Sequence, residues 1–107
     1  MDYLKEAEKA IDYLKQSEAE YAALKAQHQA LKERIKTTKA SQYLDTQAKT
    51  QKEREMTAES STEYITAIAD WEECLESFYY IEARRKRAEL TIEMYRSVNS
   101  AMKRGNI

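Results

Sequence analysis

The side chains that could do chemistry in this sequence are few, and they lack the partners that such chemistry requires. His28 is the only histidine and Cys74 the only cysteine among 107 residues. A zinc site or a nucleophile–base pair needs further ligands or bases at set spacings, and no Glu-x-x-His motif occurs. We therefore expect no catalytic residue, no metal site and no cofactor, and predict that the protein is not an enzyme.

The carboxylates gather in two clusters of the C-terminal half, Glu72, Glu73 and Glu76 in one and Glu89 and Glu93 in the other. A catalytic pair of carboxyl groups needs burial to separate the two pKa values. Both clusters fall mostly on outer or flanking helical positions, which predicts a solvated surface. Cys74 lies on the apolar side of the helix predicted in the C-terminal half, and it is predicted to be a small core residue.

The run Arg84-Arg85-Lys86-Arg87 is the most conspicuous charged motif. Basic runs can bind phosphate groups, but four consecutive helical residues point around about 300° of the circumference. We favour pairing of this run with acidic residues, either within the chain or between subunits. The acidic N-terminal stretch should lie opposite the run, with Arg85 near Glu18 and Glu20. The alternative is a nucleic-acid surface formed by a wider set of basic residues, namely Arg84, Arg87, Arg96, Lys103 and Arg104.

The elements that would position these groups are long helices. One glycine and no proline are too few for most folds that are rich in turns. Apolar residues recur at heptad spacing from residue 2 to about 44, which is typical of coiled-coil packing. Two seams carry the pattern, one through Ala7, Leu14, Tyr21, His28 and Ile35, the other through Tyr3, Ala10, Ser17, Leu24 and Leu31.

Two capping boxes interrupt the pattern, at residues 50–53 and 60–63. They predict a short middle helix at about 50–59 and a second long helix at about 62–104. An apolar stripe with a 3.5-residue repeat runs along the second long helix, through Ile68, Trp71, Leu75, Phe78, Ile81, Ala88, Ile92, Tyr95 and Met102. The prediction is a single all-α domain, 1–107, built as a long coiled-coil-like helical hairpin.

Charge predicts that the two long helices are antiparallel. The net charge is −3 over residues 1–20, +5 over 21–52, −7 over 54–82 and +5 over 83–107. Folding the chain back on itself places opposite blocks side by side, whereas a parallel arrangement would place like charges together. The matching register sets His28 beside Phe78 and Tyr21 beside Arg85.

The apolar stripes are wider than one hairpin can enclose, and eight tyrosines stand against one Phe and one Trp. Tyrosine suits half-exposed interfaces because it combines a large apolar ring with a polar tip. We expect assembly into a helical-bundle homo-oligomer or binding to another protein. The candidate interface residues are Trp71, Phe78, Tyr79, Tyr80 and Tyr95.

Other features exclude a membrane partner and indicate a cellular compartment. The longest apolar runs are three residues, as at 79–81, too short for a transmembrane helix or signal-peptide core. A lone cysteine fits a reducing cytoplasm. The net charge of −1 gives no overall attraction to nucleic acid or anionic membranes.

Several short motifs resemble those of a known group of proteins. They are Tyr13-Leu14, Ala48-x-x-Gln51-x-Glu53-Arg54-Glu55, Tyr64, Glu82-Ala83, Arg87-Ala88-Glu89 and Ile92-Glu93-x-Tyr95-Arg96-Ser97. Their order resembles small helical proteins encoded in early, recombination-associated regions of tailed-bacteriophage genomes, although members often have Trp where Tyr95 stands. The resemblance implies an accessory role near phage DNA metabolism in the host cytoplasm, with a phage or host protein as partner, and carries over no catalytic residue.

Three functional hypotheses follow. The first is a non-enzymatic helical interaction and oligomerisation protein, in the phage setting an accessory factor near DNA recombination or replication. The second is a nucleic-acid-binding module that uses the Arg84–Arg87 region. The third is a phage structural or assembly component.

Overall fold

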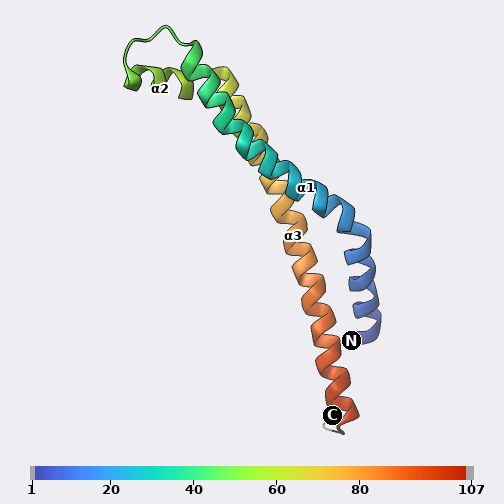
Figure 1. Ribbon diagram of the computed structural model, residues 1–107. Helices are drawn as coiled ribbons and strands as arrows, with labels where there is room; N and C mark the ends of the chain where they lie inside the picture. The colour runs from blue at the N-terminus through green and yellow to red at the C-terminus, as the bar shows by residue number, and fades with distance from the viewer. Residues whose placement is uncertain (1, 106–107) are drawn as a thin grey trace. The chain divides into compact units, whose positions relative to one another are not determined.

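The computed structural model describes residues 2–105, and every regular element in that range is a helix. The helices are α1 (Tyr3–Asp45), α2 (Gln51–Glu59) and α3 (Thr62–Lys103) (Figure 1). The expected bounds were about 2–44, 50–59 and 62–104. The all-α class and the short middle helix are therefore confirmed.

Side-chain caps explain where α2 and α3 begin. The Thr50 hydroxyl accepts a hydrogen bond from the backbone N–H of Glu53 at 3.2 Å, as the first predicted capping box requires. At α3 the cap is Ser61, whose hydroxyl accepts from the Tyr64 N–H at 3.2 Å. After α3, Gly105 adopts a φ of 74°, a left-handed conformation that glycine reaches without a Cβ penalty.

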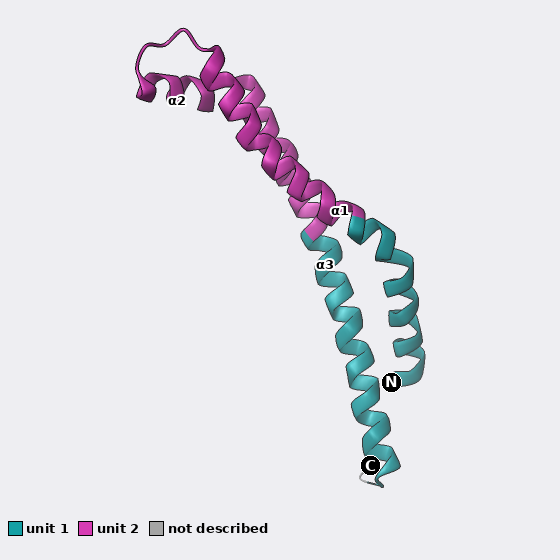
Figure 2. Cartoon of the chain, viewed as in Figure 1, with its two compact units in different colours: residues 1–22, 79–107 teal, residues 23–78 magenta. Residues whose placement is uncertain are grey.

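The chain divides into two compact units (Figure 2). Unit 1 comprises residues 1–22 and 79–107, and unit 2 comprises residues 23–78. Each unit pairs a segment of α1 with an antiparallel segment of α3, and unit 2 also contains α2. The antiparallel helical hairpin is thus confirmed, whereas the single-domain organisation stays a prediction.

The core of unit 1 is built largely from small side chains. Its buried residues all belong to the predicted stripes, and they are Ala7, Ala10, Ser17, Ile81 and Ala88. Larger seam residues such as Leu14, Tyr21 and Ile92 are half-buried at its edges. Small residues at the contact let two helices approach closely, but they remove little apolar surface from water.

Unit 2 combines small buried residues with one large aromatic side chain. Ala58, Ala67, Cys74 and Phe78 are buried, and the Phe78 ring stacks on His28 with 4.7 Å between ring centroids. This contact is the one that the antiparallel register predicts. Half-buried side chains complete the layers around it, namely Leu24, His28, Leu31, Ile35, Leu75 and Trp71.

Two ion pairs join different helices of unit 2. Arg34 of α1 lies 3.6 Å from Asp70 of α3, and Lys39 of α1 lies 2.8 Å from Glu59 of α2. Both pairs connect a basic block of the sequence to the acidic block that follows it. The opposite charges that predicted the antiparallel arrangement therefore form direct ion pairs in this unit.

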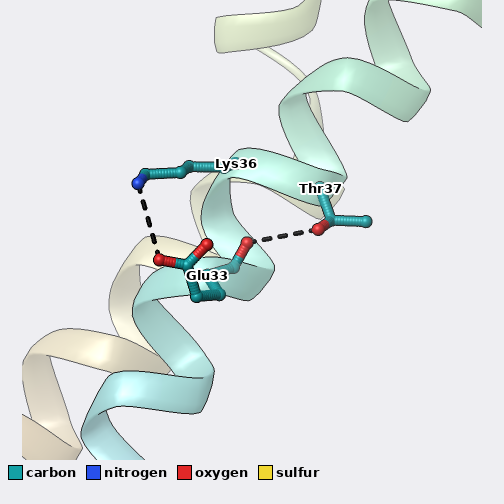
Figure 3. A network of polar contacts seen from close by, with 3 residues as sticks. All are labelled: Glu33, Lys36 and Thr37. Carbon is teal, nitrogen blue, oxygen red and sulfur yellow. Dashed lines mark hydrogen bonds and ion pairs between the residues drawn. The ribbon is translucent and has the colours of Figure 1, made fainter.

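The outer surface of α1 in unit 2 is polar and satisfied locally (Figure 3). The Lys36 ammonium lies 3.5 Å from the Glu33 carboxylate, and the Thr37 hydroxyl donates to the Glu33 carbonyl oxygen at 3.2 Å. Such exposed pairs three residues apart contribute about 0.2–0.5 kcal/mol to helix stability.

Candidate interaction face

Arg85 forms a polar contact inside the otherwise apolar packing of unit 1. Its guanidinium donates hydrogen bonds to the Leu14 carbonyl oxygen at 2.9 Å and to the Ser17 hydroxyl at 2.7 Å. The Ser17 hydroxyl donates in turn to the Tyr13 carbonyl oxygen at 2.7 Å. The guanidinium also lies over the Tyr21 ring, 4.8 Å from its centroid, as the register predicts. One arginine thereby links three successive seam positions of α1 to α3.

Within the described residues, Arg85 forms no ion pair with Glu18 or Glu20, so the expected pairing is not seen inside the chain. Both carboxylates are on exposed positions of α1, whereas seam positions recur three and four residues apart and therefore include residues 14, 17 and 21 instead. Within residues 2–105, no ion pair joins the basic run 84–87 to an acid. An acidic side chain joins this layer through Tyr21, whose hydroxyl donates to the Glu82 carboxylate at 3.3 Å.

Arg84 lies between two tyrosines on the surface of unit 1. Its guanidinium carbon is 4.7 Å from the Tyr13 ring centroid and 5.6 Å from the Tyr80 ring centroid. We call Tyr13, Tyr80 and Arg84 the tyrosine–arginine cluster. It joins a predicted interface residue, Tyr80, to a predicted nucleic-acid contact, Arg84. Tyr13 was missed because it flanks the seam, and the register pairs only seam positions.

The cluster borders one of two shallow grooves, and Glu6, Arg87 and Thr91 line both grooves. One groove, of about 320 Å³, is polar and is lined by Glu6, Lys9, Ala10, Tyr13, Arg84, Arg87, Ala88 and Thr91. The other, of about 240 Å³, is more apolar and is lined by Tyr3, Glu6, Arg87, Leu90, Thr91 and Met94. Arg87, a predicted nucleic-acid contact, thus lies next to exposed apolar side chains.

The outward side of α3 in unit 1 carries large apolar residues. Tyr80 is 66% exposed, Leu90 59% and Met94 55%. They belong to a set with alternating spacings of three and four residues, which we call the outer stripe: Tyr80, Ala83, Arg87, Leu90, Met94, Ser97 and Ala101. Leu90 and Met94 were missed, although their spacing from Tyr80 and Arg87 was a readable second heptad pattern.

The other predicted interface residues lie in different environments. Phe78 is buried inside unit 2, and Trp71 is half-buried there, so neither forms an open surface. Tyr79 is exposed and Tyr95 is half-buried in unit 1. Among the described residues, the Trp71 indole N–H and His28 Nδ1 are buried atoms without a hydrogen-bond partner.

The remaining predicted nucleic-acid contacts are not gathered around Arg84. Arg96, Lys103 and Arg104 are exposed near the end of α3. Twelve residues of helix separate Arg84 from Arg96, a rise of about 18 Å. Arg84 and Arg87 therefore form a local basic site, and the other three residues continue along the helix beyond it.

Unit 2 offers a polar groove between its long helical segments. The groove measures about 400 Å³, and Arg34, Asp70, Glu73 and Cys74 are among its lining residues. Cys74 is buried, and its thiol lies 4.0 Å from the Leu24 carbonyl oxygen, which fits a small core residue. Across residues 2–105, no three His, Cys, Asp or Glu side chains are grouped so that they could hold a metal ion.

Glu59 shifts the pKa of Lys39, its partner on α1. Its hydrogen bond and its charge raise the pKa of Lys39 above the ordinary value of 10.5. The raised pKa reflects the contact between α1 and α2 and keeps the Lys39 ammonium charged, so this lysine is not set up as a general base.

The hydropathy of the helices bears on membrane partners. None of the helices in the described part of the chain combines the length and the apolar character needed to cross a bilayer.

Comparisons with known proteins add no relative. A scan against protein-family models, a search of curated proteins and a search of solved structures each found no match.

Proposed function

We propose that this chain is a non-enzymatic helical protein that acts by associating with other helices, and first with copies of itself. The observation that supports the proposal is the distribution of apolar side chains in unit 1. Its buried positions hold mainly alanine and serine, while Tyr80, Leu90 and Met94 are more than half exposed. Leu90 and Met94 also line one groove with Tyr3, and exposed apolar patches of this kind can mark interaction sites.

Sedimentation velocity across a micromolar concentration series tests the proposal. We expect a dimer or larger species whose fraction rises with concentration, with a strongly helical circular-dichroism spectrum throughout. A monomer at every accessible concentration would contradict self-association. Helicity serves as the control, because loss of helix would indicate unfolding rather than dissociation.

The phage setting is part of the same proposal and is supported only by the sequence resemblance. An accessory factor for phage DNA recombination or replication would be encoded among early genes, whereas a structural or assembly component would be found in virions. Gene neighbourhood and mass spectrometry of purified particles distinguish the two. Detection of the chain in virions would favour the assembly role.

A nucleic-acid-binding role is a second candidate, favoured by one observation. Arg84 and Arg87 are exposed and have no ion pair to an acid among residues 2–105, and Arg84 lies against two tyrosine rings. Exposed arginine beside aromatic rings can contact phosphate and stack on bases.

Fluorescence anisotropy with single- and double-stranded DNA at several salt concentrations tests this candidate. Binding through these residues should weaken steeply with salt. Replacing Arg84 or Arg87 with Gln should reduce the log–log salt slope by about one per lost phosphate contact. Binding that is absent at low salt, or that is unchanged in both variants, would exclude this site.

A further inference from the structure

We propose that the outer stripe of α3 in unit 1 is the docking surface for a second copy of this chain, with the two α3 segments antiparallel. This inference rests on the proposed function, because it names the surface and geometry of self-association. It commits to a second copy because the stripe complements itself in both side-chain size and charge.

The outer stripe has the spacing of a second coiled-coil seam. At about 100° per residue, its centre lies about 150° around the helix from the seam that faces α1. The corresponding outward positions of α1 in unit 1 are polar or small, as at Lys5, Asp12 and Gln16. These outward α1 positions therefore do not repeat the apolar spacing of the outer stripe, which belongs to α3.

Side-chain size selects an antiparallel register. In an antiparallel coiled coil, the two alternating positions of one seam face the opposite positions of the other. One register places Tyr80 beside Ser97 of the second copy and Met94 beside Ala83 of the second copy. Tyr80 and Met94 then each face a small side chain, and the two-fold axis repeats both contacts.

Charge selects the same register. The residues that flank the stripe on one side include Lys86 and Glu93, seven positions apart. In this register, Lys86 faces Glu93 of the second copy, and the two-fold axis forms the pair twice. A shift of one heptad would instead set Glu93 against Glu93 in one direction or Lys86 against Lys86 in the other.

Arg87 argues against a parallel pair. In a parallel arrangement, its guanidinium would face the same residue of the second copy, and two like charges would meet at the centre of the contact. In the antiparallel register, Arg87 lies beside Leu90 of the second copy. Its aliphatic stem can cover that side chain while the guanidinium stays in water.

The groove beside the stripe extends the apolar surface onto α1. Tyr3 in the first turn of α1 lines the same groove as Leu90 and Met94 (Figure 1 shows the two ends of the chain in this region). A helix seated on the outer stripe would cover part of this groove and bury apolar atoms of both helices.

Disulfide trapping in full-length protein tests the geometry. In a Cys74→Ala background, Ala83→Cys and Met94→Cys variants with different affinity tags are mixed in a glutathione redox buffer. We expect the mixed disulfide to exceed both homodisulfides by roughly tenfold, because only this pair is juxtaposed. Ala83→Cys mixed with Leu90→Cys is the matched control and should give little product. Predominant homodisulfides would indicate a parallel pair and overturn the proposal.

Charge reversal tests the same contact without cysteines. Glu93→Lys should raise the dimer dissociation constant by roughly tenfold or more, because two symmetric pairs become repulsive. Lys86→Glu should act likewise, and the double reversal should restore association. Glu89→Lys makes the same charge change on a side of α3 away from the stripe and should leave the dissociation constant within about twofold.

The two experiments separate failure of this inference from failure of the proposed function. A wild-type chain that remains monomeric overturns both. A self-associating chain that forms no Ala83→Cys to Met94→Cys disulfide, or whose association is insensitive to Glu93→Lys, overturns this inference alone. Helical circular dichroism of each variant, recorded beside the wild type, shows that the variant has folded.

Discussion

The two compact units differ in which side chains they bury and in how their polar groups are paired. Unit 2 has a buried aromatic side chain, Phe78, and two ion pairs that join separate helices. In unit 1, within the described residues, no ion pair joins α1 to α3. Hydrogen bonds supply the polar links there, from Arg85 to α1 and from Tyr21 to Glu82. Most of the large exposed apolar residues also belong to unit 1: Tyr3, Leu4, Ile11, Tyr79, Tyr80, Leu90, Met94 and Met102.

This difference indicates which unit retains exposed apolar surface that association could bury. A side chain that is already buried or paired within its own unit can contribute little to association. Unit 2 uses its large aromatic residue internally, and α2 adds a third helical segment to its packing. Unit 1 uses alanine and serine internally and leaves larger side chains outside, so apolar area remains for a partner to cover.

The largest expected effect contrasts a buried residue of unit 2 with an exposed residue of unit 1. Phe78→Ala should lower the free energy of unfolding by about 3–5 kcal/mol, because it removes a buried ring and its stacking on His28. Leu90→Ala should change it by less than about 0.5 kcal/mol in dilute solution. Urea denaturation followed by circular dichroism measures both. Equal losses would show that the two units do not differ in the way described.

An intermediate effect is expected at the polar link of unit 1. Arg85→Met should cost about 1–3 kcal/mol, because the buried Ser17 hydroxyl loses a charged donor. A double-mutant cycle with Ser17→Ala should give a smaller total loss than the two single changes added. Thermal denaturation provides the values.

A charge-reversal variant at the same position distinguishes the observed contacts from the pairing expected from sequence. In an Arg85→Glu background, Glu18→Lys should not restore stability, since Arg85 contacts Leu14 and Ser17 instead of Glu18. Substantial restoration would mean that the acidic stretch does pair with this arginine.

The smallest expected effect concerns the ion pair between α1 and α2 in unit 2. Glu59 raises the pKa of Lys39, so the contribution of this pair is fully present below the ordinary lysine pKa and is lost as pH rises through the raised value. Lys39→Gln should slightly lower the melting temperature at neutral pH and flatten its decline above about pH 10. Fluorescence of Trp71, the only tryptophan, monitors unit 2 during melting. Parallel alkaline curves for the variant and wild type would contradict the assignment.

Much of the fold could be predicted because its signals are local. The signals are the heptad spacing, the hydroxyl cap at Thr50 and the single glycine after α3. Each can be read from residues within one or two helical turns of one another. Contacts at the candidate face were harder to predict, because the register described only residues in the inner seam. Tyr13 flanks that seam, and Leu90 and Met94 face away from it, so a search for one apolar stripe passed over them.

The sequence by itself determined the helices, their antiparallel pairing and the alignment of His28 with Phe78. Periodicity and blocks of charge act along the whole length of a helix, and many weak preferences therefore agree on one arrangement. Only the tertiary structure decided which side chains each unit buries and which polar groups meet. Whether Arg85 contacts a carboxylate or a backbone carbonyl depends on where its guanidinium lies across the packed helices, and spacing along one helix does not specify that position.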